Sequence, residues 1–379
     1  MRILYLTQGV TGHDRRMTAL LAGAGHRVHY LALDDVSQAP LPDGVRWEAW
    51  AARPSVDARA PEGARALVPA LREVLDRVRP DAVHAGPVQT AGYAAALADA
   101  RPRLVMSWGS DVLVDADRGP AWAEATRTAL ADADGFVFDC RTVLQRARDF
   151  AQIADERVAL FPWGTDLTRF SPGASPLRAE LSGGRGDAFV VLCTRSWEPI
   201  YGMDTLVKGF ARAWRREPRL RLVLPGGGSL AAELDGWIRD AGVEDAVLRP
   251  GPVDHAALPD WFRAADLYAS CAHSDGSSIS LLEAMATGLP VLVTDIPPNR
   301  EWVTVAENGW LAGVGDADGV ADALLAAVRT SGAERAEIGA RNRRVVEERA
   351  DWPRVARPLL ALYEGLAADA PSLAASAEG

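Results

Sequence analysis

The strongest constraint on the fold is a repeated alternation of short β-rich runs with longer stretches of helical period. The first half opens with an expected strand over residues 3–7, a helix over 14–24 and a strand over 28–33. This order predicts a parallel sheet whose strands are joined by crossover helices. Further runs of strand length follow at residues 82–85, 104–108, 136–140 and 158–161.

A second alternation starts after a segment rich in Ser, Pro and Gly, which reads SPGASPLRAELSGGRGD at residues 171–187. Such a composition is typical of a linker between compact units. Beyond it we expect strands over 189–194, 220–224, 246–248, 267–270 and 291–294, and helices over 204–216, 230–241, 258–265, 279–287 and 320–328. At 379 residues the chain is long enough for two separate cores.

We therefore predict an α/β protein with two Rossmann-like, doubly wound domains at residues 1–175 and 186–350. Sheets of this kind bind ligands at the carboxyl ends of their strands, so we expect the two domains to face a shared cleft. A helix over 351–368 is expected to cross back to the first domain. Residues 369–379 lack periodicity and are expected to form a flexible tail.

Composition excludes several classes of function. A net charge of −10 argues against nucleic acid as a partner. The N-terminus, MRILYLTQG, is typical of a buried strand rather than a signal peptide, and no apolar stretch is long enough to span a bilayer. Three widely spaced cysteines indicate buried thiols. We expect a cytoplasmic protein, and peripheral membrane contact stays open.

The most informative segment is SDGSSISLLEAMATGLPVLVTD, at residues 274–295. Asp275 lies in a loop that leads into a helix containing Glu283, and free backbone N–H groups at that helix start favour a phosphate. The residues expected to supply them are Ser277, Ser278, Ile279 and Ser280. Carboxylates on either side of such donors suit a nucleotide sugar. A simpler alternative is a capping box between Ser280 and Glu283, which have the S-x-x-E spacing.

The spacing of Asp275 and Glu283, followed by AMATGLPVLVTD, resembles the acidic pair of retaining GT-B glycosyltransferases of family 4. Other segments that resemble this family are LVLPGGG, RPGPV, NREWV and ENGWL in the second half, and PDAVHAG, WGSD and FPWGTDLTRF in the first. The resemblance implies a GT-B fold, a nucleotide-sugar donor of the UDP or GDP type held by the C-terminal domain, and an acceptor held by the N-terminal domain. It also implies retention at the anomeric carbon and no need for a metal.

The resemblance assigns roles to particular residues. Glu283 would bind the donor ribose, Asp275 the transferred sugar, and Arg195 the diphosphate, for which a guanidinium fork is suited. Gly226, in the turn after an expected strand, would lie against the donor. Gly12, in the loop TQGVTGHD, would approach the phosphates, although this loop is also compatible with a plain turn.

The family pattern usually has a lysine shortly after that arginine, and here Tyr201 takes its place. Lys208 is the one lysine of the chain, but it lies on the polar side of an expected helix and is predicted to be an ordinary solvated residue. Arg300 is a tentative second phosphate ligand, as are the arginines at 15 and 16.

Further tentative site residues lie in the first half. His13 falls where relatives often have a histidine near the donor, or is a solvated residue at a helix start. Trp108 replaces a histidine of the family and cannot accept a proton. Asp111 is expected either to contact a sugar or to cap a helix, and Trp163 to be a core residue or a stacking platform.

The predicted activity is transfer of a sugar from a nucleotide diphosphate to a hydroxyl of a small-molecule, glycan or lipid-linked acceptor. The main alternative is an epimerase or hydrolase acting on the nucleotide sugar itself. An oxidoreductase is disfavoured because the dinucleotide fingerprint is missing after the first strand, and a binding module without activity is a further alternative. Three Asp-Ala-Asp triplets, at 115–117, 132–134 and 316–318, are not expected to bind a metal.

Overall fold

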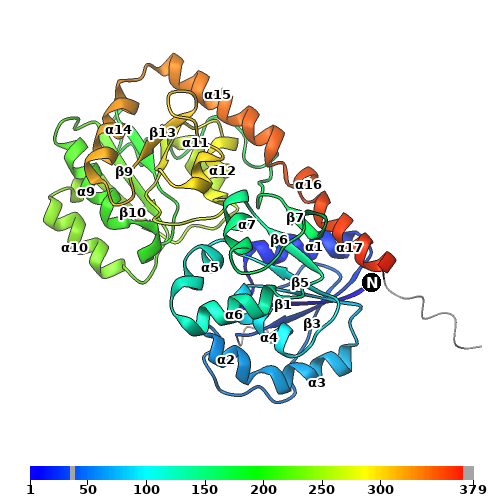
Figure 1. Cartoon of the computed structure of the whole chain (residues 1–379). Helices are drawn as coiled ribbons and strands as arrows, with labels where there is room; N and C mark the ends of the chain where they lie inside the picture. The colour runs from blue at the N-terminus through cyan, green and yellow to red at the C-terminus, as the bar shows by residue number, and fades with distance from the viewer. Residues whose placement is uncertain (35–38, 370–379) are drawn as a thin grey trace, which may run out of the picture. The chain divides into compact units, whose positions relative to one another are not determined.

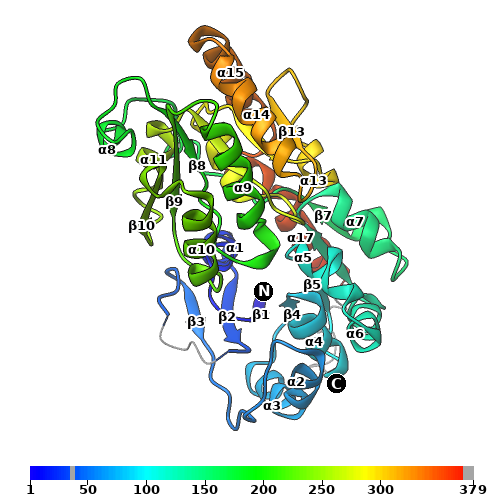
Figure 2. The same ribbon diagram turned by 90° about the vertical axis from the view of Figure 1, so that its left-hand side faces the viewer.

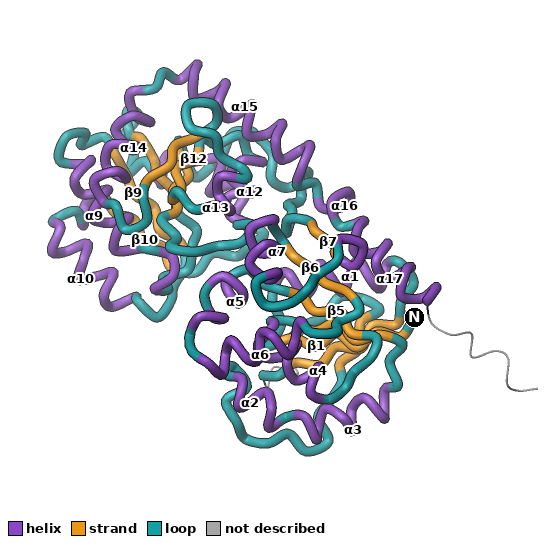
Figure 3. Tube along the Cα trace, in the orientation of Figure 1, coloured by secondary structure: helices purple, strands orange, loops and turns teal. Residues whose placement is uncertain are grey.

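The computed structural model describes residues 1–34 and 39–369. Internal contacts divide the chain into two compact units, the first formed by Met1–Pro162 and the segment from Ala356 onward, and the second by Trp163–Val355. In each unit the strands form the interior and helices surround them (Figures 1 and 3). From residue 370 onward, the expected C-terminal tail lies outside the described residues.

The first unit is built on a seven-stranded sheet whose strands are all parallel, in the order β3-β2-β1-β4-β5-β6-β7 (Figure 2). The strands are β1 (Arg2–Thr7), β2 (Arg27–Ala32), β3 (Val45–Trp47), β4 (Ala82–Ala85), β5 (Arg103–Met106), β6 (Gly135–Phe138) and β7 (Val158–Leu160). The strand order reverses between β1 and β4. In doubly wound sheets such a switch point opens a crevice at the carboxyl ends of the strands.

The helices of the first unit cover both faces of this sheet. They are α1 (Gly12–Gly23), α2 (Pro61–Ala66), α3 (Val68–Val78), α4 (Tyr93–Leu97), α5 (Ser110–Leu113), α6 (Pro120–Leu130), α7 (Arg141–Arg148) and the C-terminal α17 (Arg357–Asp369). Leu4 and Leu6 of β1 share a core cluster with Leu71 of α3. On the opposite face, Tyr363 of α17 shares a hydrogen bond of 2.8 Å with His84 Nδ1, so the last helix belongs to the first unit.

The second unit has a six-stranded parallel sheet in the order β10-β9-β8-β11-β12-β13. Its strands are β8 (Phe189–Leu192), β9 (Leu220–Pro225), β10 (Val247–Gly251), β11 (Leu267–Ser270), β12 (Val291–Thr294) and β13 (Gly309–Ala312). Its principal helices are α9 (Met203–Trp214), α10 (Ala231–Ala241), α11 (Leu258–Ala264), α12 (Ile279–Ala286), α13 (Pro297–Arg300), α14 (Ala317–Arg329) and α15 (Gly332–Arg349). The switch point lies between β8 and β11. These two sheets confirm the predicted doubly wound α/β class.

Alternate side chains of the strands in the second unit build separate cores on the two faces of the sheet. Val191 packs with Phe210 of α9 in one cluster, whereas Val190 packs with Leu282 of α12 in the other. A parallel sheet covered on both faces needs this continuous apolar run, which is why the strand was readable from the sequence.

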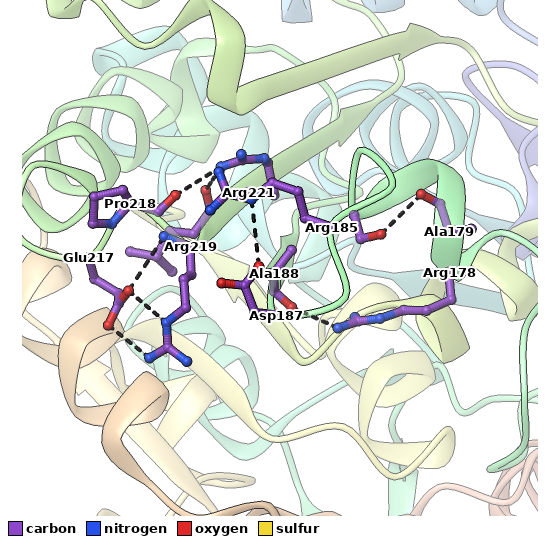
Figure 4. Close-up of polar contacts among 11 residues, drawn as sticks. Arg178, Ala179, Arg185, Asp187, Ala188, Glu217, Pro218, Arg219 and Arg221 are labelled. Atoms are coloured by element: carbon purple, nitrogen blue, oxygen red, sulfur yellow. Dashed lines mark hydrogen bonds and ion pairs between the residues drawn. The ribbon is translucent and has the colours of Figure 1, made fainter.

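The Ser-, Pro- and Gly-rich segment at 171–187 packs within the second unit. It contains a short helix, α8 (Arg178–Leu181), whose Leu181 is buried in the core. The Arg178 side chain bonds to Asp266 at 2.7 Å and to the Ala188 carbonyl at 2.8 Å. Figure 4 shows the Arg178 side chain reaching Ala188, the residue that precedes β8. The segment is therefore anchored to the amino ends of the sheet.

All three cysteines, Cys140, Cys193 and Cys271, are buried and form no disulfide, which confirms the prediction of buried thiols. Burial raises the pKa of the Cys193 thiol to about 11. Within residues 1–34 and 39–369, no helix combines the length and the apolar character needed to cross a membrane.

Lys208 lies on α9 and pairs with Asp204 at 2.8 Å, one helical turn earlier, and its side chain is 54% exposed. This confirms the prediction of an ordinary solvated helix residue. We expect Lys208→Ala to change the free energy of unfolding by less than about 0.5 kcal/mol, because exposed pairs of this spacing contribute little. Chemical denaturation measures this change. A loss of nucleotide affinity in the variant would contradict the assignment.

Candidate functional site

Several predicted site residues of the second unit gather around the switch point of its sheet. Arg195 follows β8, Gly226 follows β9, and Asp275 follows β11. Because β8 and β11 are neighbours, their following loops meet at the carboxyl edge of the sheet. This is where doubly wound sheets bind ligands.

Arg195 is the centre of this cluster. Its Nη2 lies 3.0 Å from Asp275 Oδ2, and its Nη1 donates to Ser278 Oγ at 2.9 Å and to Ser280 Oγ at 3.3 Å. The guanidinium also lies over the ring of Tyr201, 3.9 Å from the ring centroid. Tyr201, which takes the place of the family lysine, therefore packs its ring against the guanidinium of Arg195.

The cluster is largely withdrawn from solvent, since the side chains of Arg195 and Asp275 are 11% and 18% exposed. Burial by itself would lower the pKa of Arg195, but the neighbouring charge of Asp275 outweighs it and raises the pKa above its ordinary value. The guanidinium thus stays charged. Its Nε–H is buried and has no hydrogen-bond partner among the described residues, which leaves a donor for a ligand.

The loop after β8 is tied to the glycine turn after β9. Trp197 N–H donates to the Gly227 carbonyl at 2.9 Å, and Glu198 accepts from Ser229 N–H at 2.9 Å. Gly226 has a φ of +125°, a conformation that side chains other than glycine rarely adopt. A Cβ at Gly228 would lie 2.4 Å from the Trp197 carbonyl oxygen. Glycine is required at Gly226 by its backbone conformation and at Gly228 by the close approach of the Trp197 loop.

Glu283 lies on α12 and its carboxylate is 5% exposed. It bonds to His255 Nε2 at 2.9 Å, whereas the His255 side chain is 58% exposed. The capping-box alternative is wrong, because the helix N-cap is Ser278 and it makes no side-chain capping bond. Ser280 instead bonds to Arg195 and, at 2.7 Å, to the hydroxyl of Tyr268. The Glu283 carboxylate is thus directed toward the loop after β10.

Three further residues singled out in the sequence have other partners. Ser277 Oγ accepts from the backbone N–H of Trp163 at 3.3 Å, and both residues are buried. Trp163 is 4% exposed, which favours the core alternative. Arg300 on α13 is 62% exposed and forms a double hydrogen bond with Asp295, one of whose bonds measures 2.8 Å. Its charge is therefore already matched.

In the first unit, the loop after β1 enters α1 through a capping box. Thr11 Oγ1 accepts from Asp14 N–H, and the Asp14 carboxylate accepts from Thr11 N–H at 2.7 Å. Gly12 is the first helical residue, and a Cβ added there would meet no atom within 4 Å. The ring of His13 packs edge-on against Trp108, with ring centroids 5.5 Å apart.

Asp111 follows β5 and binds its own neighbourhood. Its carboxylate accepts hydrogen bonds from Ser107 Oγ at 2.6 Å and from the backbone N–H groups of Trp108, Val112 and Val88 at 2.9–3.0 Å. Burial raises the pKa of Asp111, although these bonds oppose the effect. Asp111 does not cap α5, whose N-cap is Gly109 without a side-chain capping bond; its carboxylate instead holds the loops after β4 and β5 together.

The buried Asp14 predicts a pH-dependent stability. Burial raises its pKa to about 6, although hydrogen bonds from Thr11 oppose the shift. The unfolded carboxyl loses its proton near pH 4, so stability should fall as the pH rises from 4 to 6, by up to about 3 kcal/mol. Asp14→Asn should remove this fall, whereas the exposed control Asp322→Asn should keep it. Chemical denaturation at pH 4, 5 and 6 measures the difference, and parallel curves for wild type and Asp14→Asn would contradict it.

The Asp-Ala-Asp triplets have structural partners. Asp117 pairs with Arg146 at 2.7 Å, Asp134 lies 3.7 Å from Arg101, and Asp316 accepts from Gly319 N–H to cap α14. Across the described residues, no three His, Cys, Asp or Glu side chains are placed to hold one metal ion.

The sequence matches two family profiles. The family described as "Glycosyl transferase 4-like domain" matches residues 8–164, and "Glycosyl transferases group 1" matches residues 182–345. A D-inositol 3-phosphate glycosyltransferase from Kineococcus radiotolerans is 35% identical over 175 residues, covering 43% of this chain and 40% of the relative. One from Xylanimonas cellulosilytica is 30% identical over 248 residues, covering 62% and 57%. The matched part thus spans about half the length of these relatives.

Solved structures resemble the whole chain. Sucrose-phosphate synthase from Thermosynechococcus elongatus has a TM-score of 0.84 at 20% identity, covering 97% of this chain and 100% of that one. HepE from Anabaena, in complex with UDP and glucose, has a TM-score of 0.77 at 20% identity, covering 96% and 100%. At such identities the likeness shows the fold. The two glycosyltransferase profiles together match residues 8–164 and 182–345, so this chain belongs to these glycosyltransferase families, and the structural likeness shows its GT-B fold.

Proposed function

We propose that this protein transfers a sugar from a nucleoside diphosphate sugar to a hydroxyl group with retention of the anomeric configuration. The observation that carries the proposal is the Arg195 cluster at the switch point of the second sheet, with Glu283 on the adjoining helix α12. A buried cation, a helix start and two carboxylates match the diphosphate, the ribose and the sugar of such a donor.

The main task of the site would be to stabilise charge on the departing diphosphate. Arg195 is held by Ser278, Ser280 and Tyr201, so its guanidinium needs little reorganisation before reaction. The N-terminal end of α12 adds the positive end of a helix dipole. We propose that these groups carry the reaction without a metal ion.

We propose that the configuration is retained because the acceptor hydroxyl attacks the anomeric carbon on the same face from which the diphosphate departs. The acceptor hydroxyl would form the new bond to the anomeric carbon while the bond to the diphosphate breaks, and its proton would pass to a phosphate oxygen. Trp108 stands where the family has a histidine, and its indole N–H cannot take that proton. Isolation of a sugar bound covalently to the protein would contradict this scheme.

The donor class is proposed to be a UDP or GDP sugar. HepE from Anabaena was solved with UDP and glucose, and the relatives in the comparison are named D-inositol 3-phosphate glycosyltransferases. These names suggest UDP-glucose as the first donor to assay and inositol 3-phosphate as the first acceptor. The comparisons give no support to an epimerase or hydrolase.

The experiment is a transfer assay with UDP- and GDP-sugars and a set of hydroxyl acceptors, with and without EDTA. We expect one donor to give a glycoside only when acceptor is present, and NMR of the product to show the anomeric configuration of the donor. Altered sugar or free sugar without acceptor would indicate an epimerase or hydrolase. An inverted product would overturn the retaining mechanism.

A further inference from the structure

The first unit contains a basic hollow at the opposite end of the strands from the predicted site residues of that same unit. It has a volume of about 820 Å³ and opens near the amino ends of β1 and β2, whereas Gly12 and Asp111 follow the carboxyl ends of strands. The lining residues that matter for its charge are Arg2, Arg27, His29, Arg46, Glu48 and Arg77. Among the described residues that line it, Glu48 is the one carboxylate. Figure 2 shows β1, β2 and β3 side by side in this part of the sheet.

The register of β1, β2 and β3 places three arginines of the hollow on the same face of the sheet. Arg2 of β1 is paired with Arg27 of β2, and Arg46 of β3 is paired with His29, two residues beyond Arg27. Paired residues of parallel strands project to the same face, as do residues two apart on one strand. Arg2, Arg27 and Arg46 therefore share a face. Like charges directly opposite one another are destabilising, so an anion between them would relieve the repulsion.

The partners of these arginines in the protein are mostly neutral carbonyl groups, so their positive charges are only partly neutralised. Arg2 donates to the Val78 carbonyl at 2.6 Å, and Arg77 to the Ala49 carbonyl at 2.6 Å. Glu48 lies 3.3 Å from Arg77 and 2.7 Å from His29. The exposed side chains of Arg27 and Arg46 make no hydrogen bond or ion pair within the described part of the chain. In the described lining, four arginines thus face one carboxylate, in a protein with a net charge of −10.

Trp50 adds an apolar surface to the lining of the hollow, and its Nε1 donates to the Ala32 carbonyl at 2.8 Å, which fixes the ring. A local concavity of positive charge raises the concentration of anions, and arginine forks match phosphate oxygens. We propose that the basic hollow binds the phosphate group of a phosphorylated ligand. The residues of this hollow are not among the predicted donor-binding residues, and the proposal does not depend on the proposed function.

The test uses the full chain and two sources of phosphate. Calorimetric titration at low salt measures binding of inorganic phosphate, and flotation measures binding to vesicles of phosphatidylcholine with or without phosphatidylglycerol. We expect Arg27→Ser/Arg46→Ser to weaken binding by at least about tenfold. Its matched control is Arg341→Ser/Arg344→Ser, two exposed arginines of α15 without an ion pair in the described structure, and it should bind like wild type.

Each outcome decides the proposal. Binding of inorganic phosphate that the double variant loses supports a soluble phosphorylated ligand. Binding confined to phosphatidylglycerol vesicles and lost in the same variant supports a phospholipid headgroup. No binding by wild type, or equal binding by wild type and the double variant, overturns the proposal. Both arginines are exposed, so the variant should unfold at no lower temperature than wild type, which a thermal melt verifies.

Discussion

Replacing Arg195 by alanine is expected to lower the rate of sugar transfer by about 10²–10³-fold, the usual effect of removing one preorganised donor from an active site. Arg195 is the buried cation of the cluster, and Asp275, Ser278 and Ser280 fix its direction. Its loss would leave the departing diphosphate without its main positive partner. The measurement is kcat and KM for the donor identified by the transfer assay.

Removing this arginine also leaves Asp275 without its ion-pair partner, which can destabilise the fold. Arg195→Lys controls for this effect, because it keeps a positive charge but loses the two-pronged guanidinium. The second control is Arg212→Ala, which breaks an exposed pair with Asp318 of nearly the same length, 2.9 Å. We expect Arg195→Lys to fold normally and still lose activity, and Arg212→Ala to keep it. Full activity in Arg195→Lys would rule out a bidentate phosphate contact.

The sequence predicted the strands best where both faces of the sheet are covered. Strands β4, β11 and β12 begin and end where expected, because a strand buried on both sides is a short, continuous apolar run. The edge strands β3 and β13 were not predicted. Each is short and has partly exposed residues, VRW and GWLA, so neither shows a long apolar run or a clear alternation.

The longest helix, α15, was also not predicted. Half of its 18 residues are charged, and its buried residues are Gly339, Asn342 and Val346. The helix is held in place by polar contacts with backbone carbonyls, and such contacts leave no apolar periodicity in the sequence. Asn342 donates to the Leu289 carbonyl at 2.7 Å, and Arg343 donates to the Ala286 carbonyl at 2.8 Å. A helix stabilised in this way by polar tertiary contacts lacks the apolar stripe on which sequence analysis depends.

Within the candidate site, the motif residues of the second unit could be predicted, but their partners could not. The sequence gives no sign that the Tyr201 ring packs against the Arg195 guanidinium, because this contact joins the loop after β8 to a short turn before α9. His255 was missed altogether. It follows β10 in a loop without a distinctive pattern, and it meets Glu283 through the tertiary fold.

Glu283→Gln is expected to weaken nucleotide binding by roughly 10- to 100-fold, since hydrogen bonds to a charged group contribute about 1.5–3 kcal/mol. The carboxylate is 5% exposed and bonded to His255, so its direction is fixed before the ligand arrives. If it accepts from the ribose hydroxyls, the lost affinity must depend on those hydroxyls. Calorimetry with UDP and with 2′-deoxy and 3′-deoxy analogues tests this dependence.

The substitution Glu283→Gln and the removal of one ribose hydroxyl form a double-mutant cycle, in which the protein and the ligand are each altered once. Wild type should lose affinity when a ribose hydroxyl is removed, whereas Glu283→Gln should lose much less from the same removal. Glu347→Gln, on α15 and paired with Arg343, is the matched control and should behave like wild type. Equal losses in wild type and Glu283→Gln would place the carboxylate away from the ribose. Its role would then be to hold His255 and the loop after β10, and His255→Ala should in that case reproduce the whole effect of Glu283→Gln.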